Sequence, residues 1–269
     1  NNLRPARGRK GVFMIAKYKI EFEYESKEPP NCFWGYNLYG ALMQKLPAKA
    51  AERLHENGIS PLSQYVTVDR GNNLLIWHVT VAEDINGQME ETLSRTKEYK
   101  LDGHEAVLRM AGFEKTAEIG HIDMALAYLH EKIPARHLRI KTYTPVSFKT
   151  EGEYAIFPSV ELIYKSATQK WNAFAEDVII DDDDVLKQLI ENTRIVSYRL
   201  NSFYYQIKGV KIPSFFGDVT LYIKGQESLV RMADLVLNYL EFSGLGIKCA
   251  LGMGGVKITD CTEEKTYKR

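Results

Sequence analysis

The stretch SGLGIKCALGMGGVKI, residues 243–258, holds five glycines and two lysines between a helical pattern and a strand pattern. Glycine reaches positive φ angles and lets backbone amides approach an anion without a side chain in the way. Lys248 and Lys257 add positive charge. A helix that simply ends in a turn would explain one or two glycines, so five favour a loop that contacts an anionic ligand.

The elements on either side of these glycines exclude the commoner phosphate-binding loops. Apolar residues recur at helical spacing over 226–242, and alternation predicts a strand over 255–259. Dinucleotide-binding and Walker loops need a strand before the glycines and a helix after them. The order is reversed here, so this loop belongs to neither class.

The rest of the chain predicts the element order β-α-β-β-α-β in each half. For the first half we predict strands at 16–24, 65–68, 74–81 and 104–113, and helices at 33–46, 47–56 and 86–96. For the second half we predict strands at 138–142, 196–208, 217–223 and 255–259, a turn over 209–214, and helices at 123–131, 161–177 and 226–242. This order predicts an α+β protein of two tandem ferredoxin-like (RRM-like) domains, each an antiparallel sheet with helices on one face.

The predicted domains span 14–135 and 136–269. No low-complexity linker separates them, so they are expected to pack side by side. Residues 1–13 hold four basic residues, two glycines and a proline ahead of Met14. We expect this extension to be disordered or foreign to the natural chain, which would then start at Met14.

Composition limits the classes of function. The chain of 269 residues is 45% hydrophobic and 26% charged, and no apolar run approaches the ~18 residues of a membrane span. Its 35 basic and 35 acidic residues balance, so a polyanion must be held by a local patch. Three cysteines without CxxC spacing argue against disulfides and structural zinc. We therefore expect a cytoplasmic protein that does not enter a membrane.

Four aspartates at 181–184 leave two interpretations open. Such a cluster can bind a divalent metal, but acidic residues at a helix N-terminus are also stabilised by the helix dipole and by free backbone amides. We favour the helix cap, and we predict neither a metal nor a cofactor.

Several stretches together resemble the Cas6 family of CRISPR-repeat endoribonucleases, of the RAMP superfamily. The most specific is G-L-G at 244–246, a five-residue gap, and G-M-G at 252–254. L-H-E at 54–56 followed by S-P-L at 60–62, and T-P-V-S-F at 144–148, are similar to family segments. The resemblance extends from about residue 16 to residue 258.

The resemblance implies binding of CRISPR repeat RNA and a metal-independent cut of the precursor transcript. The ribose 2′-OH attacks the adjacent phosphate and leaves a 2′,3′-cyclic phosphate and a 5′-OH. This reaction needs a base, an acid and positive charge near the phosphorane oxygens. His55 matches the family's usual catalytic histidine. Its place supports the role independently, because a histidine at a helix C-terminus is stabilised as imidazolium and can face solvent.

The remaining catalytic residues depart from the family pattern. Met43 stands where the family has a tyrosine, and a lysine often found shortly after the histidine is missing from 58–61. We nominate Lys45 as the charge that stabilises the transition state, and Tyr39, one helical turn before Met43, as a further catalytic candidate. A solvated helix face is the alternative for Lys45.

RNA contacts are expected from the glycine-rich stretch and from a basic strand pair. The expected residues are Gly244, Gly246, Lys248, Gly252, Gly254, Lys257, Arg199, Lys208 and Lys211. Aromatic residues at 198 and 203–205 lie among the strand cations, where they either stack on unpaired bases or fill a core.

The expected partner is CRISPR repeat RNA, with other Cas proteins and a second copy of the chain as further partners. Two alternatives remain open: a non-cleaving RNA-binding subunit of a CRISPR complex, and an unrelated small-molecule enzyme on the same fold.

Overall fold

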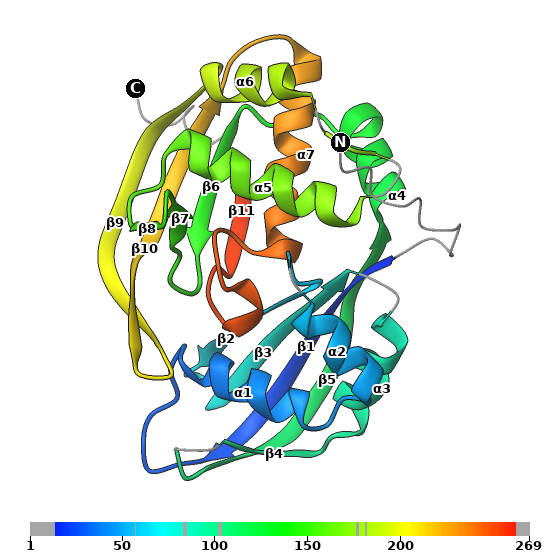
Figure 1. The fold of residues 1–269 in the computed structure, drawn as a ribbon, viewed down its shortest axis with the longest axis vertical. Coiled ribbons are helices and arrows are strands. Elements are labelled where there is room, and N and C mark those ends of the chain that lie inside the picture. Colours follow the sequence, from blue (N-terminus) through cyan, green and yellow to red (C-terminus); the bar gives the residue numbers. More distant parts are fainter. Residues whose placement is uncertain are drawn as a thin grey trace.

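Two antiparallel sheets, each packed against helices, form the two halves of the protein (Figure 1). The computed structural model describes residues 14–56, 58–82, 85–101, 104–175, 178–180 and 182–261, so the predicted extension 1–13 lies outside the described residues. Within the described residues, no helix is long and apolar enough to cross a lipid bilayer.

The first half has a five-stranded sheet in the order β2-β3-β1-β5-β4. Its strands are β1 (Met14–Glu25), β2 (Leu62–Asp69), β3 (Leu74–Ala82), β4 (Glu98–Leu101) and β5 (Ala106–Gly120). Its helices are α1 (Trp34–Met43), α2 (Ala48–His55) and α3 (Asn86–Arg95). The alternation that predicted β1 is confirmed, because Tyr18, Ile20 and Phe22 are fully buried on one face.

The second half has a four-stranded sheet in the order β11-β6-β10-β9. Its strands are β6 (His137–Thr142), β9 (Thr193–Ile207), β10 (Val210–Ile223) and β11 (Val256–Asp260), and a small hairpin is formed by β7 (Phe148–Thr150) and β8 (Glu153–Ala155). Its helices are α5 (Val160–Phe174), α6 (Asp183–Glu191) and α7 (Glu227–Ser243). Both sheets follow the ferredoxin-like order, so the tandem α+β fold is confirmed.

A helical connection joins the two sheets. It consists of α4 (His121–Leu126), continued by a π-helical turn over Ala127–Glu131. Three buried rings pack together at this connection: His121 from α4, Trp171 from α5 and Tyr239 from α7, with centroid distances of 5.1 to 5.6 Å. The same buried cluster contains Ile15 of β1. The two halves therefore share apolar packing.

The β9–β10 hairpin corrects the sequence prediction. The predicted turn over 209–214 is wrong, since β10 already begins at Val210 and the turn is only Lys208 and Gly209, at φ angles of 47° and 78°. Such a two-residue turn with positive φ angles matches the twist of the strands. Pro213 lies within β10, although proline has no amide hydrogen to donate to a neighbouring strand. It is tolerated because β10 pairs with β6 only at 218–222, which leaves one edge of β10 unpaired by β6 around Pro213.

Two smaller outcomes concern β4 and the aspartates. β4 was not predicted, because four residues are too few to show alternation.

The aspartates at the start of α6 act as a cap, since the Asp182 carboxylate accepts a hydrogen bond of 2.8 Å from the amide of Asp184. Asp181 lies outside the described residues.

The buried ring cluster predicts a pH dependence of stability. Burial lowers the pKa of His121 from 6.5 to about 4. Between these values the unfolded chain binds a proton that the folded protein does not, so the free energy of unfolding should fall as the pH drops from 6.5 toward 4, by about 3 kcal/mol. Thermal denaturation of His121→Leu over this pH range should show a shallower dependence than the wild type. His78, whose pKa is also lowered to about 4, is present in both proteins and cancels. Equal slopes would contradict the assignment.

Candidate functional site

The glycine-rich segment, residues 244–255, lies between the two halves of the molecule (Figure 1); we call it the glycine loop. The loop leaves α7 at Gly244, passes through a short 3-10 turn at Cys249–Leu251, and enters β11. Gly246 and Gly254 have φ angles of 78° and 73°, and a Cβ at either would lie 2.3 Å from a carbonyl oxygen. Close backbone packing therefore requires glycine at both positions.

The amides of the four predicted glycines donate hydrogen bonds within the protein. Gly244 donates to Leu240 O (2.8 Å), Gly246 to Ser166 Oγ (2.9 Å), Gly252 to Cys249 O (3.5 Å) and Gly254 to Pro145 O (3.0 Å). In this conformation these four amides therefore have partners within the protein. The glycines shape the loop, and any contact of theirs with RNA remains a prediction.

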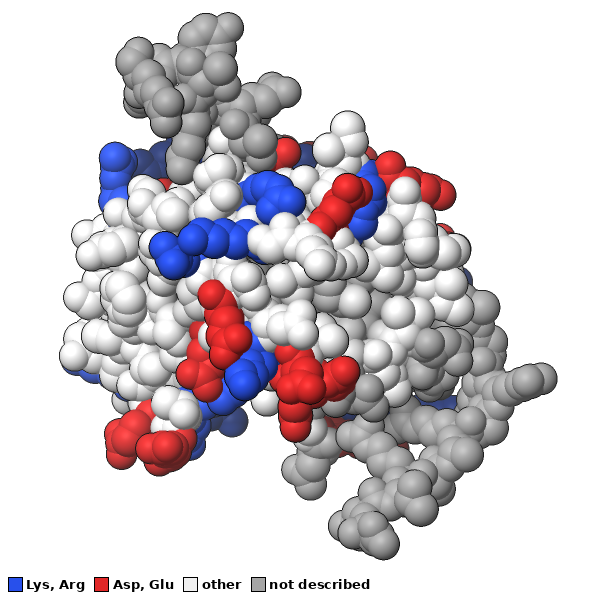
Figure 2. Space-filling view, turned by 90° about the horizontal axis from the view of Figure 1, so that it is seen from above, with Lys and Arg blue, Asp and Glu red and all other residues white. Residues whose placement is uncertain are grey.

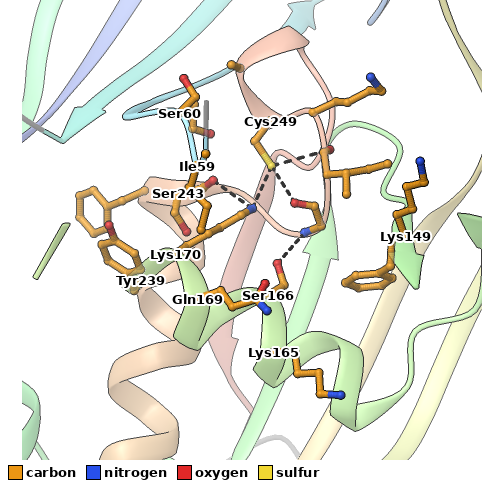
Figure 3. Close-up of a pocket in the computed structure, with 18 of the residues that line it drawn as sticks. Ile59, Ser60, Lys149, Lys165, Ser166, Gln169, Lys170, Tyr239, Ser243 and Cys249 are labelled. Atoms are coloured by element: carbon orange, nitrogen blue, oxygen red, sulfur yellow. Dashed lines mark hydrogen bonds between the residues drawn. The ribbon is translucent and has the colours of Figure 1, made fainter. Parts of the chain in front are cut away.

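A buried lysine fixes the start of the loop. The Lys170 ammonium donates to Gly244 O (2.6 Å) and Ser243 O (3.3 Å), and it lies 3.0 Å from Cys249 Sγ (Figure 3). A cation is favourable here because the last carbonyls of α7 carry the negative end of the helix dipole. Sequence patterns did not single out this role, since Lys170 is 74 residues from Gly244 along the chain.

A cavity of about 820 Å³ opens beside the loop (Figure 3). The segment that follows His55, from Gly58 to Ser63, forms one wall, and α5, β7 and the loop form the others. Lys149, Lys165, Lys170 and Lys248 are its cations. Lys165 pairs with Glu161 at 2.6 Å, whereas among the ion pairs between described residues none involves Lys149 or Lys248. Glu151 and Glu161 also line the cavity, and Glu161 is the partner of Lys165, so the four lysines outnumber the two carboxylates.

The structure brings two of the predicted catalytic residues together. His55 is exposed at the last position of α2, and its ring lies edge-on to Tyr39, with centroids 6.5 Å apart and planes at 89°. Burial raises the pKa of the half-buried Tyr39, with a smaller contribution from Tyr36, so its phenol stays protonated at neutral pH. Lys45 Nζ lies instead 5.6 Å from the ring centroid of Tyr99 on β4, at the sheet edge opposite β2.

The β9–β10 hairpin carries the predicted strand cations. Arg199, Lys208 and Lys211 are exposed, and so are the rings of Tyr198 (60%) and Tyr204 (62%). Tyr205 is fully buried and belongs to the core, whereas stacking of Tyr198 and Tyr204 on bases remains a prediction.

Charge elsewhere is less concentrated. Lys257 of the predicted set pairs with Glu241 at 3.0 Å. The end of the molecule seen in Figure 2 shows cationic and anionic side chains beside one another, so neither sign forms a single patch on the described part of that face. Among the residues of the candidate site, exposed cations are therefore found at two places: the cavity and the β9–β10 hairpin.

Comparison with solved structures agrees with this architecture. A Cas6 product complex superimposes with a TM-score of 0.75 at 18% identity, over 91% of this chain and 99% of that one. Thermus thermophilus Cas6 gives a TM-score of 0.71 at 20% identity, over 93% and 100%. The fold and the glycine loop define a protein of the tandem ferredoxin-like class to which these Cas6 structures belong.

Comparison of sequences is more specific. The family model for CRISPR-associated endoribonuclease Cas6 matches residues 140–256. A CRISPR-associated endoribonuclease Cas6 of Streptococcus thermophilus is 30% identical over 244 residues, which cover 90% of this chain and 98% of that protein. One from Mycobacterium tuberculosis is 25% identical, over 83% and 71%. The chain belongs to the Cas6 family of CRISPR-associated endoribonucleases.

The position of Lys170 predicts a stability effect. Substitution Lys170→Met removes the ammonium from two carbonyls and a thiol and leaves buried acceptors without a donor, which should lower the free energy of unfolding by about 2 kcal/mol. Urea denaturation measures this change. Lys165→Met, on the exposed face of the same helix, is the matched control and should change stability by less than about 0.5 kcal/mol. Equal effects of the two substitutions would contradict the structural role of Lys170.

Proposed function

We propose that this protein binds CRISPR repeat RNA and cuts the precursor transcript to give mature guide RNAs. The observation that carries the proposal is the exposed His55 ring beside Tyr39, in a chain 30% identical to a CRISPR-associated endoribonuclease. An imidazole exposed at a helix end is accessible to a bound ligand and can accept or donate a proton.

The proposed chemistry is an internal displacement at phosphorus. The 2′-OH next to the scissile phosphate loses its proton and attacks, and the 5′ oxygen leaves with a proton, so that a 2′,3′-cyclic phosphate and a 5′-OH result. His55 serves as the base or the acid of this reaction. A phenol is protonated at neutral pH, and burial raises the pKa of Tyr39 further, so Tyr39 can donate a hydrogen bond to the reacting phosphate. The reaction as written needs no metal.

The positive charge for the phosphorane is proposed to come from lysines near the cavity. Lys248 and Lys149 line the cavity with the segment that follows His55. Lys45 remains a candidate for this role, although its ammonium lies over Tyr99. An ammonium close to the developing negative charge lowers the barrier most where water is excluded.

RNA binding is proposed to involve the β9–β10 hairpin as well. Its exposed cations, Arg199, Lys208 and Lys211, follow phosphates, while Tyr198 and Tyr204 stack on unpaired bases. Other Cas proteins and a second copy of the chain are further proposed partners. A neighbour described as a partial Cas6-RT-Cas1–Cas2 complex has a similar fold at a TM-score of 0.63.

The central test is cleavage of a repeat RNA in EDTA. His55→Ala should slow cleavage by about 10²- to 10⁴-fold, because proton transfer is lost, while the Kd for RNA changes little. Gel analysis and mass spectrometry of the product ends measure both the rate and the 2′,3′-cyclic phosphate. His130→Ala, another exposed histidine, is the control. If wild type binds the repeat but leaves it intact, the non-cleaving RNA-binding subunit becomes the better description.

The proposed role of the hairpin predicts a salt effect. Lys208→Ala and Lys211→Ala should each weaken RNA binding and reduce the slope of log K against log salt by about 0.7 to 0.9, because one phosphate contact is lost. Lys187→Ala, on the exposed face of α6, should leave the slope unchanged. Fluorescence anisotropy over a salt series measures the slopes, and unchanged slopes in both hairpin variants would remove the hairpin from the RNA interface.

A further inference from the structure

One buried amide ties the glycine loop to the first half of the protein. Gln64 lies on β2 with 1% of its surface exposed. Its Nε2 donates to Gly35 O (2.9 Å) on α1 and to Ala250 O (3.0 Å) in the loop, and its Oε1 accepts from the Trp77 indole (2.8 Å) on β3. This side chain therefore links three elements, one of them 186 residues away.

The orientation of the Gln64 amide is fixed by its partners. An indole N–H can only donate and a carbonyl can only accept, so turning the amide over would break all three hydrogen bonds. Both amide protons and the amide oxygen are used. A buried polar group with every hydrogen bond made holds its neighbours in one arrangement, because any displacement leaves a buried donor or acceptor unpaired.

Neighbouring contacts hold the same edge of the loop. A Cβ on Gly252 would lie 3.3 Å from the backbone of Gly35, so the loop and the start of α1 meet backbone to backbone. On the other side, Tyr205 Oη lies 3.1 Å from Leu251 O. The carbonyls of Ala250 and Leu251 thus face the protein, and the 3-10 turn that contains them is docked along this edge.

Lys248 immediately precedes that turn and is rigidly connected to it. Its backbone is left-handed, with φ 58°, and its carbonyl accepts hydrogen bonds from Leu251 (2.9 Å) and Met253 (3.4 Å). A shift of the turn must therefore move Lys248. The Lys248 side chain is exposed and lines the cavity that the segment after His55 also lines.

We infer that Gln64 is a positioning residue for RNA cleavage, which holds the 3-10 turn so that Lys248 stands at the cavity beside the segment that follows His55. Gln64 is buried and therefore acts through Lys248. The inference rests on the proposed function, since it assigns a role within the same site.

A double-substitution experiment separates positioning from general stability. Gln64→Leu removes all three hydrogen bonds, and Gln64→Glu keeps an acceptor for the indole but sets an oxygen against two carbonyls. Either change, like Lys248→Ala, should slow repeat RNA cleavage by about tenfold.

The double substitutions then test whether Gln64 acts through Lys248. If it does, the variant with both Gln64→Leu and Lys248→Ala cleaves no more slowly than Lys248→Ala alone. In the variant with Gln64→Leu and Lys208→Ala, by contrast, the two fold-changes multiply. Multiplied effects in both combinations would overturn the inference.

Hydrogen exchange of the loop amides, without RNA, provides a readout independent of cleavage. Gln64→Leu and Gln64→Glu should speed exchange over residues 250–255 by about tenfold or more, because the turn loses its anchor. The control is Thr67→Val, also on β2, which removes the contact of Thr67 Oγ1 with His78 Nε2 (3.1 Å) and touches no loop residue.

The two possible failures are distinguishable. Unchanged exchange in folded Gln64 variants overturns the inference even where RNA is cleaved. Faster exchange together with a wild type that neither binds nor cleaves repeat RNA overturns the proposed function, and with it the role of Gln64 in cleavage.

Discussion

The close approach of the glycine loop to the first half is the contact on which the site depends. Gly252 meets Gly35 backbone to backbone, and Gln64 bonds to both segments. The loop belongs to the second half of the chain, and His55 belongs to the first. A site that uses residues from both halves needs their relative placement fixed to a fraction of an ångström, because proximity and orientation decide rates. Side chains on these glycines would separate the two backbones.

Hydrogen bonds within the protein explain why the glycine loop keeps its shape. Its glycine amides, the last carbonyls of α7 and the amide of Gln64 all have partners within the protein. Because an unpaired buried polar group costs about 1 to 3 kcal/mol, alternative loop conformations are disfavoured. The exposed cations that we propose to contact RNA are Lys149 and Lys248 at the cavity and those of the β9–β10 hairpin.

The lysines of the site fall into two groups: those with partners inside the protein and those exposed at its surface. The sequence carries no net charge, so attraction for a polyanion arises locally. Lys165 and Lys257 are paired with glutamates, and Lys170 is buried against carbonyls, so these three charges have partners within the protein. A count of lysines in the sequence does not separate such cations from those exposed at the cavity.

Local patterns in the sequence determined much of the fold. The alternation of β1, the helical spacing of α1, α2, α5 and α7, and the repeated β-α-β-β-α-β order all reflect periodicities that neighbouring residues carry. The end of α2 at His55 and the place of the glycine loop between α7 and β11 were also visible, because helix ends and glycine runs are local signals.

Tertiary structure decided what those signals mean chemically. Sequence could not show that the glycine amides are already bonded, that Tyr205 is buried while Tyr204 is exposed, or that Gln64 and Lys170 anchor the loop. The tolerance of Pro213 within β10 depends on which strand lies beside β10. Each of these outcomes depends on partners far away in the chain, such as Ala250 for Gln64, and hydrogen bonds over such separations leave no period or spacing in the sequence.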